Sequence, residues 1–244
     1  MGDTIPRMTR TRVRIRYRKL DDLRWLGHQD LVRVWERLLR RADVRPAHSE
    51  GFHKRPKMNF PSALAVGIGS LDEVLELELE NDCDLDELSS RIDAHAPPGL
   101  TVGSIERMPP PARFSQPAGA VYEIRLPEDR CETVRAQIAR LQRAPSGPHT
   151  ADSALSSSAT APAGAVDAAA DSATATLVNS PSVEPPSLPA SVREVSIVDD
   201  VLRMDLRLGE AGAVRPRDLL AALGLADLET TGARLMRTRV EVAS

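Results

Sequence analysis

The chain has 244 residues, enough for one or two domains, and its hydrophobic content of 41% is ordinary for a folded protein. Its 2 cysteines are too few for the three-cysteine cluster of a radical-SAM enzyme or for a cysteine-based zinc ribbon, and we expect a reducing, cytoplasmic location. No apolar run is as long as a membrane span and the first residues lack the apolar core of a signal peptide, so we expect neither.

The net charge of −3 conceals an uneven distribution of charges along the chain. Residues 1–57 contain sixteen Lys and Arg against seven Asp and Glu, whereas residues 72–95 contain ten acids against one arginine. This asymmetry predicts either a polarised first domain or two neighbouring strands that neutralise each other.

The first hundred residues alternate between patterns typical of strands and of helices. Residues 12–18 place arginines at every second position, and residues 73–80 alternate leucine and glutamate, which in both cases indicates a strand. The expected elements are a strand at 12–18, a helix at 28–42, an extended segment at 58–68, a strand at 73–80, a short helix capped by Asp84 at 84–94 and a strand at 100–108.

The same order of elements recurs in the second half of the chain. The expected elements are a strand at 121–126, a helix at 128–142, a hairpin of 192–198 with 201–208, a short helix from Pro216 to Gly224 and a strand at 233–242. Residues 144–190 are rich in Ala, Ser, Pro and Thr and lack Lys and Arg, so we expect a disordered insert there.

Both halves therefore predict an α+β fold, a tandem of two ferredoxin-like (β-α-β-β-α-β) units. The first unit covers residues 10–110, and the second covers 118–143 plus 191–243 around the insert. In such a unit the first and third strands are neighbours. We therefore expect the arginines of 12–18 and the glutamates of 73–80 to form a ladder of opposite charges in preference to an open RNA-binding platform.

The helix at 28–42 and the loop after it hold the densest group of chemically reactive side chains. The loop from Pro46 to Lys57 combines three cations and two histidines with one aromatic residue, which exceeds what a surface loop requires. Lysine, arginine and exposed backbone N–H groups together make an anion site, and an aromatic ring can stack on a base.

These residues carry a family resemblance. The pattern RYRK…LRWLGHQDLVRVWERLLRRA…SEGFHKRPKMNFPSALAVGIGS…DEVLELEL resembles an uncharacterised bacterial family of radical-SAM-linked proteins, most strongly over residues 10–110. The His28–Asp30 motif, the Gly51–Phe52 pair and the run 56–60 carry it, whereas Lys54 stands where the family commonly has proline. The resemblance implies a separately encoded radical-SAM enzyme as partner.

We therefore expect an accessory protein that binds RNA, or positions it for modification, through the 48–57 loop. The candidate RNA- or anion-binding residues are Arg33, Arg37, Gly51, Phe52, His53, Lys54, Arg55 and Lys57. Two alternatives stay open. One is a metal-independent RNA-processing enzyme, whose candidate catalytic residues are His28, Asp30 and His53. The other is a protein–protein adaptor that does not bind RNA.

In the main hypothesis His28 and Asp30 brace the loop. We expect no metal site, because His28 and Asp30 do not have the spacing of a helical ligand pair, and no cofactor.

Overall fold

The computed structural model describes residues 10–50, 52–109, 113–143, 188–210 and 212–243. These residues form a mixed α/β fold with one mostly antiparallel sheet and four α-helices. Gly51 and nearly all of the insert predicted at 144–190 lie outside the described residues. No helix in the described part of the chain is long and apolar enough to cross a membrane.

The elements follow the predicted order closely. The first half contains β1 (Thr11–Lys19), the 3₁₀ helix η1 (Asp21–Trp25), α1 (His28–Arg41), β2 (Met58–Asn59), β3 (Gly69–Leu79), α2 (Leu85–Asp93) and β4 (Leu100–Arg107). The second half contains β5 (Gln116–Arg125), α3 (Glu128–Arg143), β6 (Val192–Val198), β7 (Val201–Arg207), α4 (Pro216–Ala222) and β8 (Met236–Ala243). Asp84 caps α2 as predicted, because its carboxylate accepts hydrogen bonds from the N–H groups of Asp86 and Glu87.

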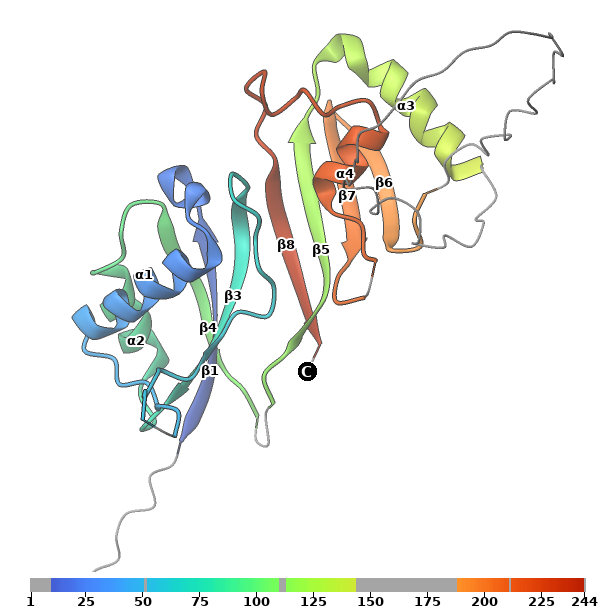
Figure 1. The fold of residues 1–244 in the computed structure, drawn as a ribbon. Coiled ribbons are helices and arrows are strands. Elements are labelled where there is room, and N and C mark those ends of the chain that lie inside the picture. Colours follow the sequence, from blue (N-terminus) through green and yellow to red (C-terminus); the bar gives the residue numbers. More distant parts are fainter. Residues whose placement is uncertain (1–9, 51, 110–112, 144–187, 211, 244) are drawn as a thin grey trace, which may run out of the picture.

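The strands lie in the order β4-β1-β3-β8-β5-β7-β6, and β2 pairs with β3. The two halves meet where β3 and β8 run parallel, with Gly69 opposite Met236 and Ser70 opposite Arg237. In Figure 1 these two strands lie side by side at the centre of the molecule and separate toward the lower end. The described part of the sheet is therefore continuous across both halves, which the sequence patterns did not predict.

The extended segment predicted at 58–68, which contains Pro61 and Gly67 as breaks, forms a strand only in its first two residues. Only Met58 and Asn59 pair with β3. Pro61 has no N–H group to donate to a ladder, so pairing does not continue through it. The chain then leaves the sheet and crosses to the second half, where Ser62 accepts a hydrogen bond from Arg237.

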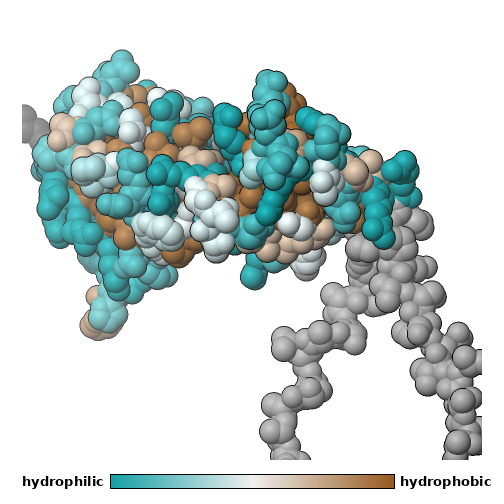
Figure 2. All heavy atoms as spheres, turned by 90° about the horizontal axis from the view of Figure 1, so that it is seen from above, coloured by the Kyte–Doolittle hydropathy of each residue, from teal (hydrophilic) through white to brown (hydrophobic). Residues whose placement is uncertain are grey.

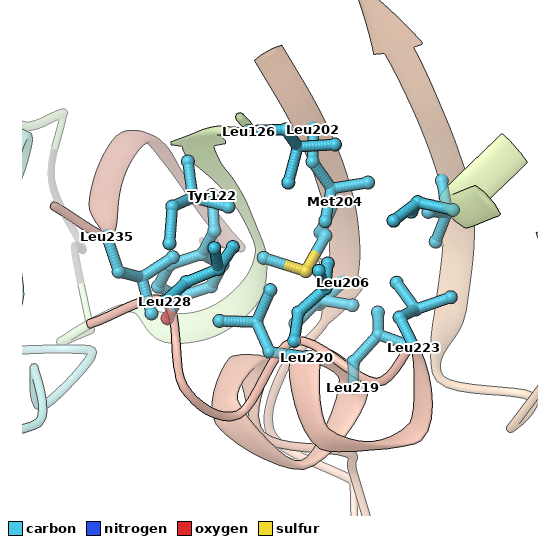
Figure 3. Close-up of a cluster of buried hydrophobic side chains, with 14 of the residues drawn as sticks. Tyr122, Leu126, Leu202, Met204, Leu206, Leu219, Leu220, Leu223, Leu228 and Leu235 are labelled. Atoms are coloured by element: carbon cyan, nitrogen blue, oxygen red, sulfur yellow. The ribbon is translucent and has the colours of Figure 1, made fainter. Parts of the chain in front are cut away.

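Each half buries its own hydrophobic core. In the first half α1 places Leu31, Trp35 and Leu38 on the buried face of β1, and the ring of Trp35 contacts Tyr17 edge-on at 5.0 Å. In the second half the side chains of β7, Met204 and Leu206 among them, point toward leucines of α4 (Figure 3). Apolar residues at helical spacing on α1 and at alternate positions on β1 produce this packing.

The ladder of opposite charges between β1 and β3 is confirmed. Arg12 lies opposite Glu78 and Arg14 opposite Glu76, with ion-pair distances of 3.0 Å in both cases. Arg16 binds Asp72 at 2.7 Å. Arg12, Arg14 and Arg16 therefore have protein carboxylates as partners, whereas Arg18 at the end of the strand is exposed.

The ladder is less exposed than the alternating pattern predicts. Glu76 is fully buried and accepts hydrogen bonds from Ser115 N at 2.8 Å and Ser115 Oγ at 2.6 Å. The carboxylate of Asp72 also accepts a hydrogen bond from Val240 N at 2.8 Å. Ser115, just before β5, and Val240 of β8 therefore cover part of the face of β3 that the sequence pattern assigns to solvent.

We expect Glu76→Gln to lower the free energy of unfolding at neutral pH by about 1–3 kcal/mol and to make it less dependent on acid pH. Burial alone raises the pKa of Glu76, but hydrogen bonds from Ser115, Arg14 and Asn59 outweigh it and hold the pKa below the ordinary 4.5. Because the folded pKa is the lower one, the stabilisation is complete above about pH 4.5 and is lost as the pH falls through the folded pKa.

Urea unfolding between about pH 7 and pH 3 measures this difference. Glu106→Gln is the matched control, because Glu106 also binds Arg14, at 3.2 Å, but its side chain is 59% exposed. An unchanged acid slope in Glu76→Gln would show that Glu76 does not contribute to acid stability.

The surface seen from above carries no single hydrophobic face. Figure 2 shows hydrophobic residues in scattered areas between hydrophilic ones on this side of the molecule. Scattered apolar residues are ordinary on a protein surface and do not indicate a binding site. This face therefore gives no indication of an apolar binding site.

Candidate functional site

The loop at 48–56 is anchored at the end of β3 by backbone hydrogen bonds. Ala47 N donates to Glu78 O at 2.7 Å, and Lys57 N donates to Ala47 O at 2.8 Å. Within the loop, Ser49 N donates to Arg55 O at 2.8 Å and Arg55 N donates to Ser49 Oγ at 3.1 Å. These contacts hold both arms together, so the residues between them project away from the sheet.

The side chains at the end of this loop face solvent. Phe52 is fully exposed, and His53, Lys54 and Arg55 are exposed beside it. Lys57 differs, because its ammonium group binds Glu78 at 3.3 Å and is half-buried. Burial raises the pKa of Glu78, but Arg12 and Lys57 together outweigh this and lower it. The predicted anion-binding role of Lys57 therefore competes with an ion pair inside the protein.

The C-terminal part of α1 carries exposed arginines next to this loop. Arg37, Arg40 and Arg41 are exposed, and Arg45 is exposed just after the helix. Arg33, one turn earlier, binds Asp30 of its own helix at 3.1 Å. Within the described residues, no ion pair with an acid is found for a set that we name the cationic surface: Arg37, Arg40, Arg41, Arg45, Lys54 and Arg55.

A groove of about 480 Å³ lies between the end of α1 and the loop. Its loop side is formed by His48, Lys54 and Arg55, whereas α1 and the residues just after it contribute both cations and acids. The residues that line it are Glu36, Leu39, Arg40, Asp43, Val44, Arg45, Pro46, His48, Lys54, Arg55, Pro56 and Glu80. His48 Nδ1 lies 3.9 Å from a carboxylate oxygen of Glu80, too far for a direct hydrogen bond.

The region that contains the groove matches a known protein family. Residues 12–156 match the model of a family described as uncharacterized proteins conserved in bacteria, DUF2344. The chain belongs to this family. No curated protein matches its sequence.

The residues matched to DUF2344 include the whole cationic surface and the groove. They also span the charge ladder and continue through β5 and α3. The candidate site is therefore part of the family domain itself.

Among the described residues of this DUF2344 domain, no hydrogen bond or ion pair joins the candidate catalytic residues His28, Asp30 and His53. His28 begins α1 and its ring meets Phe60 edge-on at 5.5 Å, while Asp30 binds Arg33. At 1.5 Å per helical residue, His28 lies about 18 Å along the helix axis from Arg40, which lines the groove. His53 is in the exposed loop. The described contacts of His28 and Asp30 are thus with Phe60 and Arg33, and the expectation that they brace the loop stays a prediction.

His28 also does not cap the helix. The N-cap residue of α1 is Gly27, and no side-chain hydrogen bond caps this end. Among the described residues, no three His, Cys, Asp or Glu side chains are grouped closely enough to hold a metal ion. The groove thus offers charge and shape but no grouped metal ligands within the described chain.

Three residues that line the groove, Arg40, Arg45 and Glu80, were not among the predicted site residues, whereas His48 lies in the predicted 48–57 loop. The arginines had a readable signal, because the run of cations continues from the last turn of α1 into the loop. Glu80 had none. It joins the groove because Glu80 N donates to Arg45 O at 3.1 Å, a pairing between segments that no local pattern specifies.

Proposed function

We propose that this DUF2344 protein is an accessory protein that binds RNA through the cationic surface and works beside a separately encoded radical-SAM enzyme. One observation carries the RNA part of the proposal. Arg12, Arg14 and Arg16 of β1 are held by acids of β3, whereas the cationic surface has no such ion pairs among the described residues. Unpaired, exposed cations are free to exchange small counterions for phosphates.

The arrangement of these cations supports phosphate binding. Arg40 comes from a helix whereas Lys54 and Arg55 come from a loop held at both arms, and all three line one groove. Arginine binds phosphate through a planar fork of donors and lysine acts as a compact point charge, so together they suit a phosphate backbone. Converging cations from two elements also define a direction for the bound strand.

The link to a radical-SAM enzyme is supported by the sequence resemblance of residues 10–110. Only Cys83 and Cys131 are present, one in each half, and Cys131 is buried. A radical-SAM cluster requires three cysteines, so the partner would hold the cluster. This chain would contribute RNA binding and positioning.

We also infer that each half is a ferredoxin-like unit. The order β4-β1-β3 with β2 beside β3, and the order β8-β5-β7-β6, support this inference. RNA-binding domains of related topology often use the sheet face. Here the outer face of the first half carries the paired ladder, which favours α1 and the loop as the contact surface.

One alternative has its own supporting observation. The groove also contains Glu36, Asp43 and Glu80, and surfaces of mixed charge suit a protein partner. In this alternative the chain is an adaptor that docks on the enzyme without RNA.

Fluorescence anisotropy with labelled RNA and a salt titration separates these functions. We expect the affinity of the wild-type chain to fall steeply with salt. Arg40→Glu/Lys54→Glu/Arg55→Glu should weaken binding at least about tenfold and lower the log–log salt slope by about two units, because each phosphate contact contributes about 0.7. Lys57 is left unchanged because it binds Glu78 inside the protein.

The matched control is Arg125→Glu/Arg140→Glu/Arg203→Glu. These three arginines are exposed in the second half, so their reversal changes the net charge equally. The control should keep its affinity for RNA. Equal losses in both variants would indicate non-specific attraction, and absence of wild-type binding at low salt would reject the RNA function.

A further inference from the structure

Phe52 is exposed to an extent that packing does not explain. Its relative exposure is 105%, whereas the next most exposed large hydrophobic side chain in the described chain, Val198, is at 60%. A fully exposed phenyl ring gains none of the free energy that burial would provide, and it contributes nothing to the core. Its position therefore calls for a partner outside the folded chain.

The loop presents this ring in a defined place. The hydrogen bonds between Ser49 and Arg55, together with the bridge between His48 and Pro56, close the loop only a few residues from Phe52. A loop closed in this way leaves less conformational freedom to be lost when a ligand binds. Phe52 is followed within three residues by Lys54 and Arg55, so an aromatic face and two cations lie on one projection.

The charges of the groove favour a narrow ligand. His48, Lys54 and Arg55 of the loop and Arg40 of α1 line it together with the acids Glu36, Asp43 and Glu80. A single strand places one row of phosphates among these charges, so it meets fewer repulsive contacts with the acids than two rows would. A duplex carries two rows of phosphates and keeps its bases stacked inside, so it would approach the acids and leave Phe52 without a base to contact.

We propose that Phe52 and the groove select single-stranded RNA, with an unpaired base stacked on Phe52 and the neighbouring phosphates bound by Arg40, Lys54 and Arg55. This inference rests on the proposed RNA-binding function and adds the class of RNA and the residue that recognises it. Stacking on an aromatic ring tolerates every base, so the site distinguishes strandedness more than sequence.

The test measures binding of the full chain to an unstructured RNA of about 12 nucleotides and to the same RNA as a duplex, since sites on single strands span about 4–16 nucleotides. Phe52→Ala should weaken binding to the single strand about 5- to 150-fold, the usual effect of losing one stacked base. The salt slope should stay unchanged, because no phosphate contact is lost. Phe52→Trp should keep the affinity, and RNA should quench its added fluorescence.

Two outcomes would overturn the inference while leaving RNA binding intact. One is wild-type binding to RNA that Phe52→Ala does not change. The other is an equal loss for single strand and duplex. Because Phe52 makes no contribution to the core, the variant tests binding and not folding. Absence of any RNA binding by the wild type would instead reject the proposed function, and this inference with it.

Discussion

Arg237→Met is expected to lower the free energy of unfolding by about 3–5 kcal/mol, the usual cost of leaving one charge of a buried ion pair uncompensated. Arg237 of β8 is fully buried, and its guanidinium binds both carboxylate oxygens of Glu73 on β3, with Nε at 2.8 Å from Oε1. It also donates to Ser62 Oγ at 2.8 Å. The pair joins the two halves of the sheet next to the place where β3 and β8 run parallel.

Lys19 does not replace Arg237 as the ion-pair partner of Glu73 in the variant. Its side chain is buried and donates to Leu26 O at 2.9 Å. Burial lowers the pKa of Lys19, and the positive charge of Arg237 lowers it further, whereas Glu73 raises it. Removing Arg237 therefore leaves Glu73 near one cation whose donor is already directed at a carbonyl oxygen.

Chemical denaturation with circular dichroism gives the free energies for this comparison. Arg135→Met is the control, because Arg135 forms a 2.7 Å pair with Glu132, whose side chain is 88% exposed, and exposed pairs of this kind contribute less than about 1 kcal/mol. Arg237→Met with Glu73→Leu should recover part of the loss, since Glu73 then no longer stays buried as a carboxylate without its arginine. A single variant no less stable than the control would show that the pair does not hold the halves together.

Local periodicity was sufficient to predict most helices, most strands and the ladder. Arginines at alternate positions from Arg12 to Arg18 required a strand, and Leu31, Trp35 and Leu38 required a helix with one buried face. Such local patterns could not predict the Arg237–Glu73 pair. Its members are 164 residues apart, and their meeting depends on how β3 and β8 align.

The sequence predicted that the candidate site contains exposed cations, but not which residues belong to it. The cations of the 48–57 loop stand out in the sequence, and the structure leaves Lys54 and Arg55 exposed. Lys57 was indistinguishable from them, because its ion pair depends on the pairing of the 45–59 segment with β3. His28 looked functional for its type and neighbours, yet the length of α1 separates it from the groove.

Trp35→Ala is also expected to lower the free energy of unfolding by about 3–5 kcal/mol, as large-to-small changes of buried aromatic residues do. Trp35 is fully buried in α1 and fits edge-on against Tyr17 of β1. The variant leaves a cavity between helix and sheet that surrounding side chains fill only in part. The measurement is urea unfolding followed by circular dichroism, because the change removes one of the 2 tryptophans.

Trp25→Ala is the matched control. Trp25 is 58% exposed and its ring lies under the guanidinium of Arg24 at 4.9 Å, so its loss should cost less than about 1 kcal/mol. Trp35→Phe should fall between wild type and Trp35→Ala, since it keeps the aromatic contact. Equal effects of Trp25→Ala and Trp35→Ala would contradict the packing of α1 described above.

Substitutions on the two faces of α1 should therefore have different effects in experiments. The buried face, with Trp35 and Leu38, fixes the helix on the sheet, whereas the exposed face carries Arg37 and Arg41. Changes to the first face should reduce stability without altering the charge presented to RNA. The triple reversal at Arg40, Lys54 and Arg55 should reduce RNA affinity and leave the free energy of unfolding nearly unchanged, because these side chains have no ion pair in the described chain to lose. A large loss of stability in that variant would mean that the cationic surface is part of the fold and not a binding site.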